Sequence, residues 1–139
     1  MINKYKIVTT ATPLRISFAG GGTDFKSYYS RRDGKVFSTT INKFVYVTVK
    51  RHSNLFEEKY RLNYSTAEIC QNLNKIKNNI TRECLKYLNI NFPVYISTVS
   101  DIPTSSGLGS SSSFTVGLLH ALLILKNKKF SLKELAEAA

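Results

Sequence analysis

Alternation of hydrophobic and polar positions near the start of the chain predicts β-strands. Residues 14–19 alternate apolar and polar side chains, which predicts a half-buried strand with Arg15 and Ser17 on one face. Residues 4–9 alternate more weakly and are interpreted as an earlier strand. We expect a break between the two at Thr12-Pro13, because proline has no backbone donor for a sheet.

Two further β-rich runs lie close together and predict a hairpin. Residues 36–41 and 44–49 are rich in β-branched and aromatic side chains, and Asn42-Lys43 separates them as the turn. Shorter strands are predicted at residues 60–64 and 91–97. The side chains expected to face the core are Val45, Val47, Val49, Val94 and Ile96.

Helical periodicity marks the second half of the chain. Apolar side chains recur at steps of three and four from Ile69 to Leu88, which predicts one amphipathic helix. The run 114–125 is apolar on nearly every side, so a second helix is expected inside the core. Ser131, with Glu134 three positions later, predicts a capping box at the start of a third helix.

The stretch from Pro103 to Ser113, called the serine loop below, precedes the core helix. It contains Gly107 and Gly109, and four consecutive serines follow from Ser110. Glycines let an anion approach the main chain. The first N–H groups of a helix have no partner within the helix, so a helix N-terminus favours negative charge. The serines can act as caps there. The sequence therefore predicts a phosphate-binding loop. A flexible linker is the alternative, which the long apolar helix directly after the loop argues against.

Spacing excludes several other kinds of site. The serine loop is not a Walker A motif, because no Gly-Lys-Ser/Thr follows its glycines. It is not a hydrolase nucleophile elbow either, because the second glycine of Gly-x-Ser-x-Gly is absent. His52 and His120 are the only histidines, and no His/Cys pair has zinc-ligand spacing, so no structural metal is expected. His120 is interpreted as a core side chain.

The charge balance favours anionic ligands. The 139 residues include 20 Lys and Arg against 9 Asp and Glu, which gives a formal net charge of +11. Such a charge suits nucleotides, sugar phosphates or nucleic acid. Because the basic residues are dispersed, a solvated basic surface is favoured over a nucleic-acid-binding tract.

Cysteine usage and hydropathy indicate the compartment. Cys70 and Cys84 both fall in the helix predicted over residues 69–88, too far apart for a disulfide along it. With no secretory segment at the N-terminus, we interpret them as reduced thiols. The apolar run 114–125 is too short to span a bilayer. We therefore expect a cytoplasmic protein that does not contact a membrane.

Two stretches resemble motifs of the GHMP kinases, the superfamily of galactokinase, homoserine kinase, mevalonate kinase and phosphomevalonate kinase. The serine loop matches the family pattern Pro-x-x-x-Gly-Leu-Gly-Ser-Ser-Ala at each fixed position except Ser112, where alanine is usual. The stretch from Pro13 to Phe25 is similar to the family's N-terminal motif. Its Gly-Gly-Gly-Thr-Asp form, and the stretch from Thr39 to Val47, resemble the branch of D-glycero-D-manno-heptose 7-phosphate kinases and fucokinase-like sugar kinases.

This resemblance implies a role for each motif. Arg15 would be a catalytic residue that stabilises charge on the transferred phosphoryl group, and Ser111 would contact Mg²⁺. The ATP phosphates would be held by Pro103, Ser106, Gly107, Leu108, Gly109, Ser110, Ser111 and Ser112. The sugar would be bound by Gly20, Gly21, Gly22, Thr23 and Asp24. Taken alone, Arg15 would be interpreted as a surface strand residue and Asp24 as a helix N-cap.

The resemblance also implies a fold and an activity. The expected fold is α+β, the ribosomal protein S5 domain 2-like N-terminal domain of a GHMP kinase, over residues 1–139 as one domain. The implied activity is that of a sugar kinase dependent on ATP and Mg²⁺, with heptose 7-phosphate phosphorylated at its anomeric hydroxyl. The family's catalytic aspartate, Mg²⁺-binding glutamate and third motif fall beyond Ala139, so we expect an incomplete domain that is inactive alone.

Two other functions stay open from the sequence. One is a non-catalytic nucleotide- or sugar-binding module that descends from a kinase. The other is a basic RNA-binding domain with the S5-like fold, for which the dispersed charge gives little support. The sequence does not fix the oligomeric state.

Overall fold

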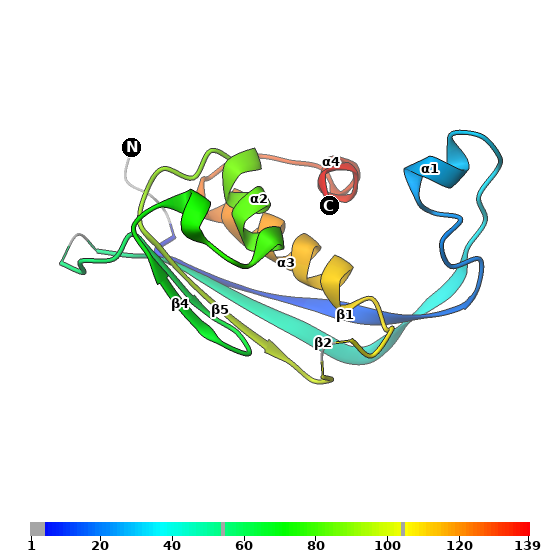
Figure 1. Ribbon diagram of the computed structural model, residues 1–139, viewed down its shortest axis with the longest axis horizontal. Coiled ribbons are helices and arrows are strands. Elements are labelled where there is room, and N and C mark those ends of the chain that lie inside the picture. The colour runs from blue at the N-terminus through cyan, green and yellow to red at the C-terminus, as the bar shows by residue number, and fades with distance from the viewer. Residues whose placement is uncertain (1–4, 54, 104) are drawn as a thin grey trace.

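The chain folds into one mixed sheet with helices α2, α3 and α4 on one of its faces (Figure 1). The computed structural model describes residues 5–53, 55–103 and 105–139. In chain order the elements are β1 (Ile7–Ala19), α1 (Lys26–Tyr29), β2 (Phe37–Arg51), β3 (Tyr60–Asn63), β4 (Ala67–Cys70), the 3₁₀ helix η1 (Leu73–Lys75), α2 (Asn79–Tyr87), β5 (Val94–Ser100), α3 (Ser110–Leu125) and α4 (Leu132–Ala138). The expected α+β fold is confirmed.

The sheet has the strand order β1-β2-β5-β3-β4. Neighbouring strands are antiparallel except β3 and β5, which are parallel. The inward-facing side chains predicted on β2 and β5 are all at most 2% exposed, whereas Tyr46 between them is 37% exposed. Alternation along these strands therefore separates the face beneath the helices from the open face.

β2 is one continuous strand, so the hairpin predicted at Asn42-Lys43 is wrong. The strand pairs along β1, and the register shifts between Pro13 and Arg15. At this shift, three residues of β2 lie opposite Leu14 alone. The polar dipeptide thus lies in a β-bulge, which bends the strand without ending it.

β1 also continues through Pro13, so the predicted break at Thr12-Pro13 is wrong. β1 is an edge strand, where a residue without an N–H can be accommodated. Arg15 and Ser17 lie on one face as predicted, and Arg15 Nη1 donates a hydrogen bond to Ser17 Oγ. Lys4, the first residue of the predicted earlier strand, lies outside the described residues.

The helix predicted over residues 69–88 is correct only in its second half. Its first half forms the end of β4 and then η1, and α2 begins at Asn79. The side chains of Asn72 and Asn78 each accept a hydrogen bond from a backbone N–H two or three residues later, at 2.9 Å. These local bonds start two separate turns where the apolar spacing predicts one helix.

α3 lies over β1 and β2 and forms the centre of the core, as predicted. Its N-cap is Gly109, with φ of 77° and no side-chain cap, so the expected serine cap is wrong. At Gly117 a Cβ would lie 2.7 Å from Thr12 Oγ1, and Thr10 Oγ1 donates to the Gly117 carbonyl at 2.9 Å. This glycine therefore lets the helix approach the sheet closely. The capping box predicted for α4 is confirmed.

No helix within the described ranges is long and apolar enough to cross a membrane.

Candidate functional site

The serine loop is attached to the middle of β1 by two hydrogen bonds. The Arg15 N–H donates to the Leu108 carbonyl at 3.0 Å. At the other end of the loop, Ser113 Oγ donates to the Pro13 carbonyl at 2.9 Å. Thr104 of the loop lies outside the described residues. The N-terminus of α3 is thus fixed against nearby positions of one strand.

Arg15 lies directly against Gly109. A Cβ added to Gly109 would be 3.1 Å from Arg15 Cγ and 3.2 Å from Nε, and the φ of this glycine is +77°. Any other residue here would strain the backbone and crowd the arginine side chain. The structure therefore brings the predicted catalytic arginine and the predicted phosphate loop together.

Ser110 supplies a buried polar atom to the same place. Its Oγ has no hydrogen-bond partner among the described residues. A buried hydroxyl left without a partner is costly, and a ligand oxygen at the helix N-terminus would satisfy it. The loop geometry and this hydroxyl together fit a phosphate group.

A groove of about 680 Å³ begins at the serine loop and extends to the N-terminus of α2. Of the predicted phosphate-binding residues, Pro103, Ser110 and Ser111 line it. Ser106, Gly107 and Ser112 are exposed but do not line it. The volume of this groove lies within the range of small-molecule sites.

Sequence reasoning missed the other wall of this groove. Tyr64, Ser65 and Asn78 line it together with the serines. They come from the turn after β3 and from the cap of α2, so only the fold brings them near the serine loop. The start of α2 after Asn78 was not predicted, because the apolar residues before and after it have the spacing of a single helix.

Acidic side chains around the groove give little support for a metal site held by protein alone. Asp101 Oδ2 accepts a hydrogen bond from the Phe44 N–H at 2.8 Å. The described residues contain no group of three or more His, Cys, Asp or Glu side chains that could hold a metal ion. Mg²⁺ at a nucleotide is commonly held by phosphates, waters and one or two protein ligands. Ser111, the predicted Mg²⁺ ligand, is exposed and lines the groove.

The predicted sugar-binding residues lie at the far end of β1, in the arm formed by residues 20–36 (Figure 1). Thr23 Oγ1 donates to the carbonyls of Gly20 and Lys35 at 2.8 and 3.0 Å, which joins the beginning of the arm to its end. Asp24 Oδ1 accepts from the Gly22 N–H at 3.1 Å. The structure thus joins these residues to one another and to Lys35 within the arm.

The arm carries no core of its own. All its residues except Gly20 and Thr23 are exposed, including Phe25 at 67% and Tyr29 at 54%. The short helix α1 has Phe25 as its N-cap, without a side-chain bond. The interpretation of Asp24 as a helix cap is therefore wrong.

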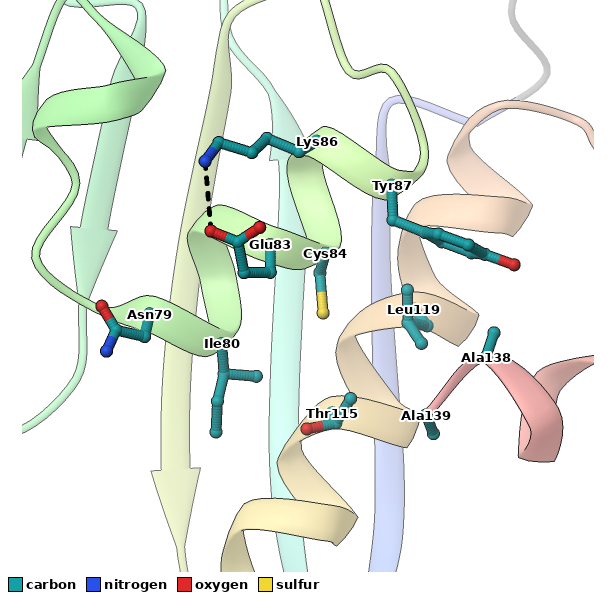
Figure 2. A pocket seen from close by; sticks show the side chains of 10 residues that line it. All are labelled: Asn79, Ile80, Glu83, Cys84, Lys86, Tyr87, Thr115, Leu119, Ala138 and Ala139. Atoms are coloured by element: carbon teal, nitrogen blue, oxygen red, sulfur yellow. Dashed lines mark hydrogen bonds and ion pairs between the residues drawn. The ribbon is translucent and has the colours of Figure 1, made fainter. Parts of the chain in front are cut away.

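A second hollow, of about 730 Å³, lies between α2, α3 and α4 (Figure 2). Cys84 points into the space between α2 and α3, and burial raises the pKa of its thiol to about 11. Such a thiol stays protonated and is a poor nucleophile.

Other side chains of this region are paired or unreactive. Glu83 forms an ion pair with Lys86 at 3.1 Å. Cys70 lies on β4, and neither cysteine forms a disulfide, as expected.

His120 packs beside this region rather than in a catalytic cluster. Its ring meets Phe130 edge-on, with centroids 5.2 Å apart. The side chain is half-buried, so His120 packs against an aromatic ring at the margin of the core and not inside the core as expected.

The chain is similar to a known protein family and to known proteins. Residues 72–139 match the family described as GHMP kinases N terminal domain. The chain is 32% identical over 146 residues to the D-glycero-alpha-D-manno-heptose 7-phosphate kinase of Campylobacter jejuni, a match that covers 96% of this chain. The chain spans 42% of the length of that relative.

Solved structures share the fold. The crystal structure of a D-glycero-D-manno-heptose 1-phosphate kinase from Bacteriodes thetaiotaomicron superposes with a TM-score of 0.77 at 22% identity, over 94% of this chain and 45% of that one. The mevalonate kinase of Methanococcus jannaschii superposes with a TM-score of 0.70 at 25% identity, over 97% of this chain and 45% of that one. The fold is therefore common to kinases with different small-molecule acceptors.

Proposed function

We propose that the chain carries the ATP-binding part of a sugar kinase, because its residues 72–139 match the family described as GHMP kinases N terminal domain. The observation that carries the proposal is the contact of Arg15 with Gly109, beside the Ser110 hydroxyl, which has no hydrogen-bond partner among the described residues. A guanidinium, a buried hydroxyl and a helix N-terminus meet there. Each of these groups favours a phosphate oxygen.

The ATP phosphates lie over the N-terminus of α3 in this proposal. They accept hydrogen bonds from backbone N–H groups of residues 106–112 and from Ser110 Oγ, and Ser111 is a ligand to their Mg²⁺. Arg15 stabilises the charge that develops as the terminal phosphoryl group moves, because its guanidinium is already positioned there. The rest of the nucleotide occupies the groove next to the loop.

The acceptor is proposed to be a sugar phosphate, namely D-glycero-D-manno-heptose 7-phosphate. This assignment rests on the relative from Campylobacter jejuni at 32% identity and on the Gly-Gly-Gly-Thr-Asp motif. Gly20 to Asp24 bind the sugar hydroxyls, with the Asp24 carboxylate as an acceptor. The net charge of +11 would attract such an anionic acceptor. We further propose that the protein acts in the cytoplasm.

A non-catalytic nucleotide-binding module is the second candidate, and one observation favours it. Asp101 lines the groove, and one of its carboxylate oxygens, Oδ2, accepts the Phe44 N–H, which makes that oxygen a weaker acceptor for a proton from a sugar hydroxyl. The chain also spans only 42% of its curated relative. We therefore expect ATP binding with little or no turnover from these 139 residues alone.

Two measurements on the purified chain test the proposal. Calorimetric titration with MgATP should show saturable binding, and an ATP-dependent phosphorylation assay on heptose 7-phosphate should show little product. Turnover like that of an ordinary kinase would contradict the expected inactivity. The absence of ATP binding would contradict the proposal itself, and steeply salt-dependent RNA binding in its place would favour the RNA-binding alternative.

A further inference from the structure

Glu68 is a buried carboxylate beside the groove that the proposed reaction does not use. It lies on β4 and is only 8% exposed. One oxygen accepts from the Lys77 N–H at 2.7 Å. The other accepts from the Asn78 N–H at 3.1 Å and from the Tyr64 hydroxyl. All three partners are therefore donors.

These partners belong to two segments that form one wall of the groove. Tyr64 directly follows β3, and Asn78 caps α2 by accepting from the Thr81 N–H at 2.9 Å. Both residues line the groove that Ser110 and Ser111 also line. Glu68 itself does not line it, so this carboxylate acts on the groove only through its neighbours.

The bonds at Glu68 require a charged acceptor. Burial raises the pKa of the carboxyl, but the bonds from Tyr64 and from the N–H groups of Lys77 and Asn78 more than offset this effect and lower the pKa below its usual value. A glutamine would turn an amide N–H₂ toward one of these donors and leave it unpaired. An ionised carboxylate is thus the side chain that satisfies all three bonds.

We propose that Glu68 is a positioning residue of the nucleotide site: it holds Tyr64 and Asn78 as the wall that receives the nucleoside part of ATP. The inference rests on the proposed function, because it assumes that the phosphates occupy the serine loop. The site then has two parts, the serine loop and the nucleoside wall. The loop binds phosphate without help from Glu68, whereas the nucleoside wall depends on it.

The decisive experiment compares two ligands on one variant. Glu68→Gln should weaken ATP binding by roughly tenfold, as expected when a hydrogen bond to a charged group is lost. It should leave the binding of inorganic tripolyphosphate unchanged within about twofold, since this probe contacts only the loop. Glu137→Gln, on an exposed carboxylate of α4, is the matched control and should change neither affinity.

Loss of both affinities together, or of neither, would overturn the inference. Tyr64→Phe provides a milder variant if Glu68→Gln does not fold. It removes the hydroxyl donor and keeps the two backbone bonds, so it should weaken ATP binding by a smaller factor and again spare tripolyphosphate. An equal loss for both ligands in this variant would likewise overturn the inference.

A readout without nucleotide distinguishes this inference from the proposed function. Amide hydrogen exchange at Lys77 and Asn78 should be faster in Glu68→Gln, or in Glu68→Asp if the glutamine variant does not fold, with α3 amides unchanged. If the native chain binds no ATP, the proposed function fails, but this exchange still shows whether Glu68 holds the wall. Unchanged protection of both amides would overturn the inference.

Discussion

The middle of β1 and the arm that follows it carry neighbouring motifs but differ in how the fold supports them. At Arg15 the strand is bonded to the serine loop and packs on Gly109. Beyond Ala19 the arm bonds mainly to itself and is exposed almost throughout. The phosphate end of the proposed site is thus preorganised in this chain, whereas the sugar end is not packed against it.

The middle of β1 and the arm should also differ in local stability. Segments with few buried contacts open at lower free energy than core segments. The arm has no buried residue, whereas α3 contains eight. We therefore expect substitutions in the middle of β1 to affect folding and ATP binding, and matched substitutions at its arm end to affect neither.

The largest expected effect concerns packing along β1. Leu14 is fully buried and Phe18 is 63% exposed. Leu14→Ala should lower the free energy of unfolding by about 2–5 kcal/mol, because it leaves a cavity in the core. Phe18→Ala should cost less than about 1 kcal/mol. Urea denaturation of both variants measures the difference, and equal losses would contradict the contrast.

The next effect concerns two glycines in the two motifs. Gly109→Val should abolish measurable ATP binding, at least about a hundredfold in affinity, because the new side chain meets Arg15 and a positive φ. Gly21→Ala is the matched control: a Cβ there meets nothing within 4 Å. It should leave ATP affinity unchanged. Calorimetric titration compares them, and retained affinity in Gly109→Val would remove the serine loop from the site.

A third effect separates the two charged candidates. Arg15→Ala should weaken ATP binding by about tenfold, since one charge-assisted contact to phosphate is lost. Asp24→Ala should leave ATP binding unchanged, because Asp24 lies in the arm and bonds to Gly22. Fluorescent-nucleotide displacement can measure both. A larger loss with Asp24→Ala than with Arg15→Ala would reverse the proposed roles.

The smallest effect is a pH dependence of stability. Hydrogen bonds hold the pKa of Glu68 below its usual value of 4.5 in spite of burial. Its contribution to stability is therefore present above that value and is lost as the pH falls through the lower pKa of the folded state. Between about pH 6 and about pH 3, the native chain should lose more unfolding free energy than Glu68→Gln. A parallel loss in the two proteins would contradict the bonding of this carboxylate.

Local pattern predicted those elements whose environment is set by their own sequence. The apolar run of α3, the alternation of Val45, Val47 and Val49, and the capping box at Ser131 follow from periodicity and from cap chemistry. The loop motif and Arg15 were likewise identified from spacing and from family resemblance. Their contact could not be predicted from strand periodicity, because it depends on how α3 packs over β1.

The errors come from features that depend on hydrogen-bond partners outside the hydrophobic pattern of the segment itself. Asn42-Lys43 has turn-like composition, but Thr40 and Phe44 on either side of it both pair with β1, which makes it a bulge. The helix predicted from Ile69 onward failed because Glu68 accepts the N–H groups of Lys77 and Asn78, which a continuous helix would use internally. The groove wall at Tyr64 was missed for the same reason, since only the placement of β3 beside β5 brings it to the serine loop.

Titration of the isotopically labelled chain with MgATP, followed by amide chemical shifts, tests the account most directly. The account predicts that shifts concentrate at Arg15, Gly109 and Ser110 and along the groove, while the amides of Gly21 and Asp24 in the arm stay unchanged. Shifts confined to the arm, or no shifts at saturating nucleotide, would contradict a phosphate site built on the serine loop.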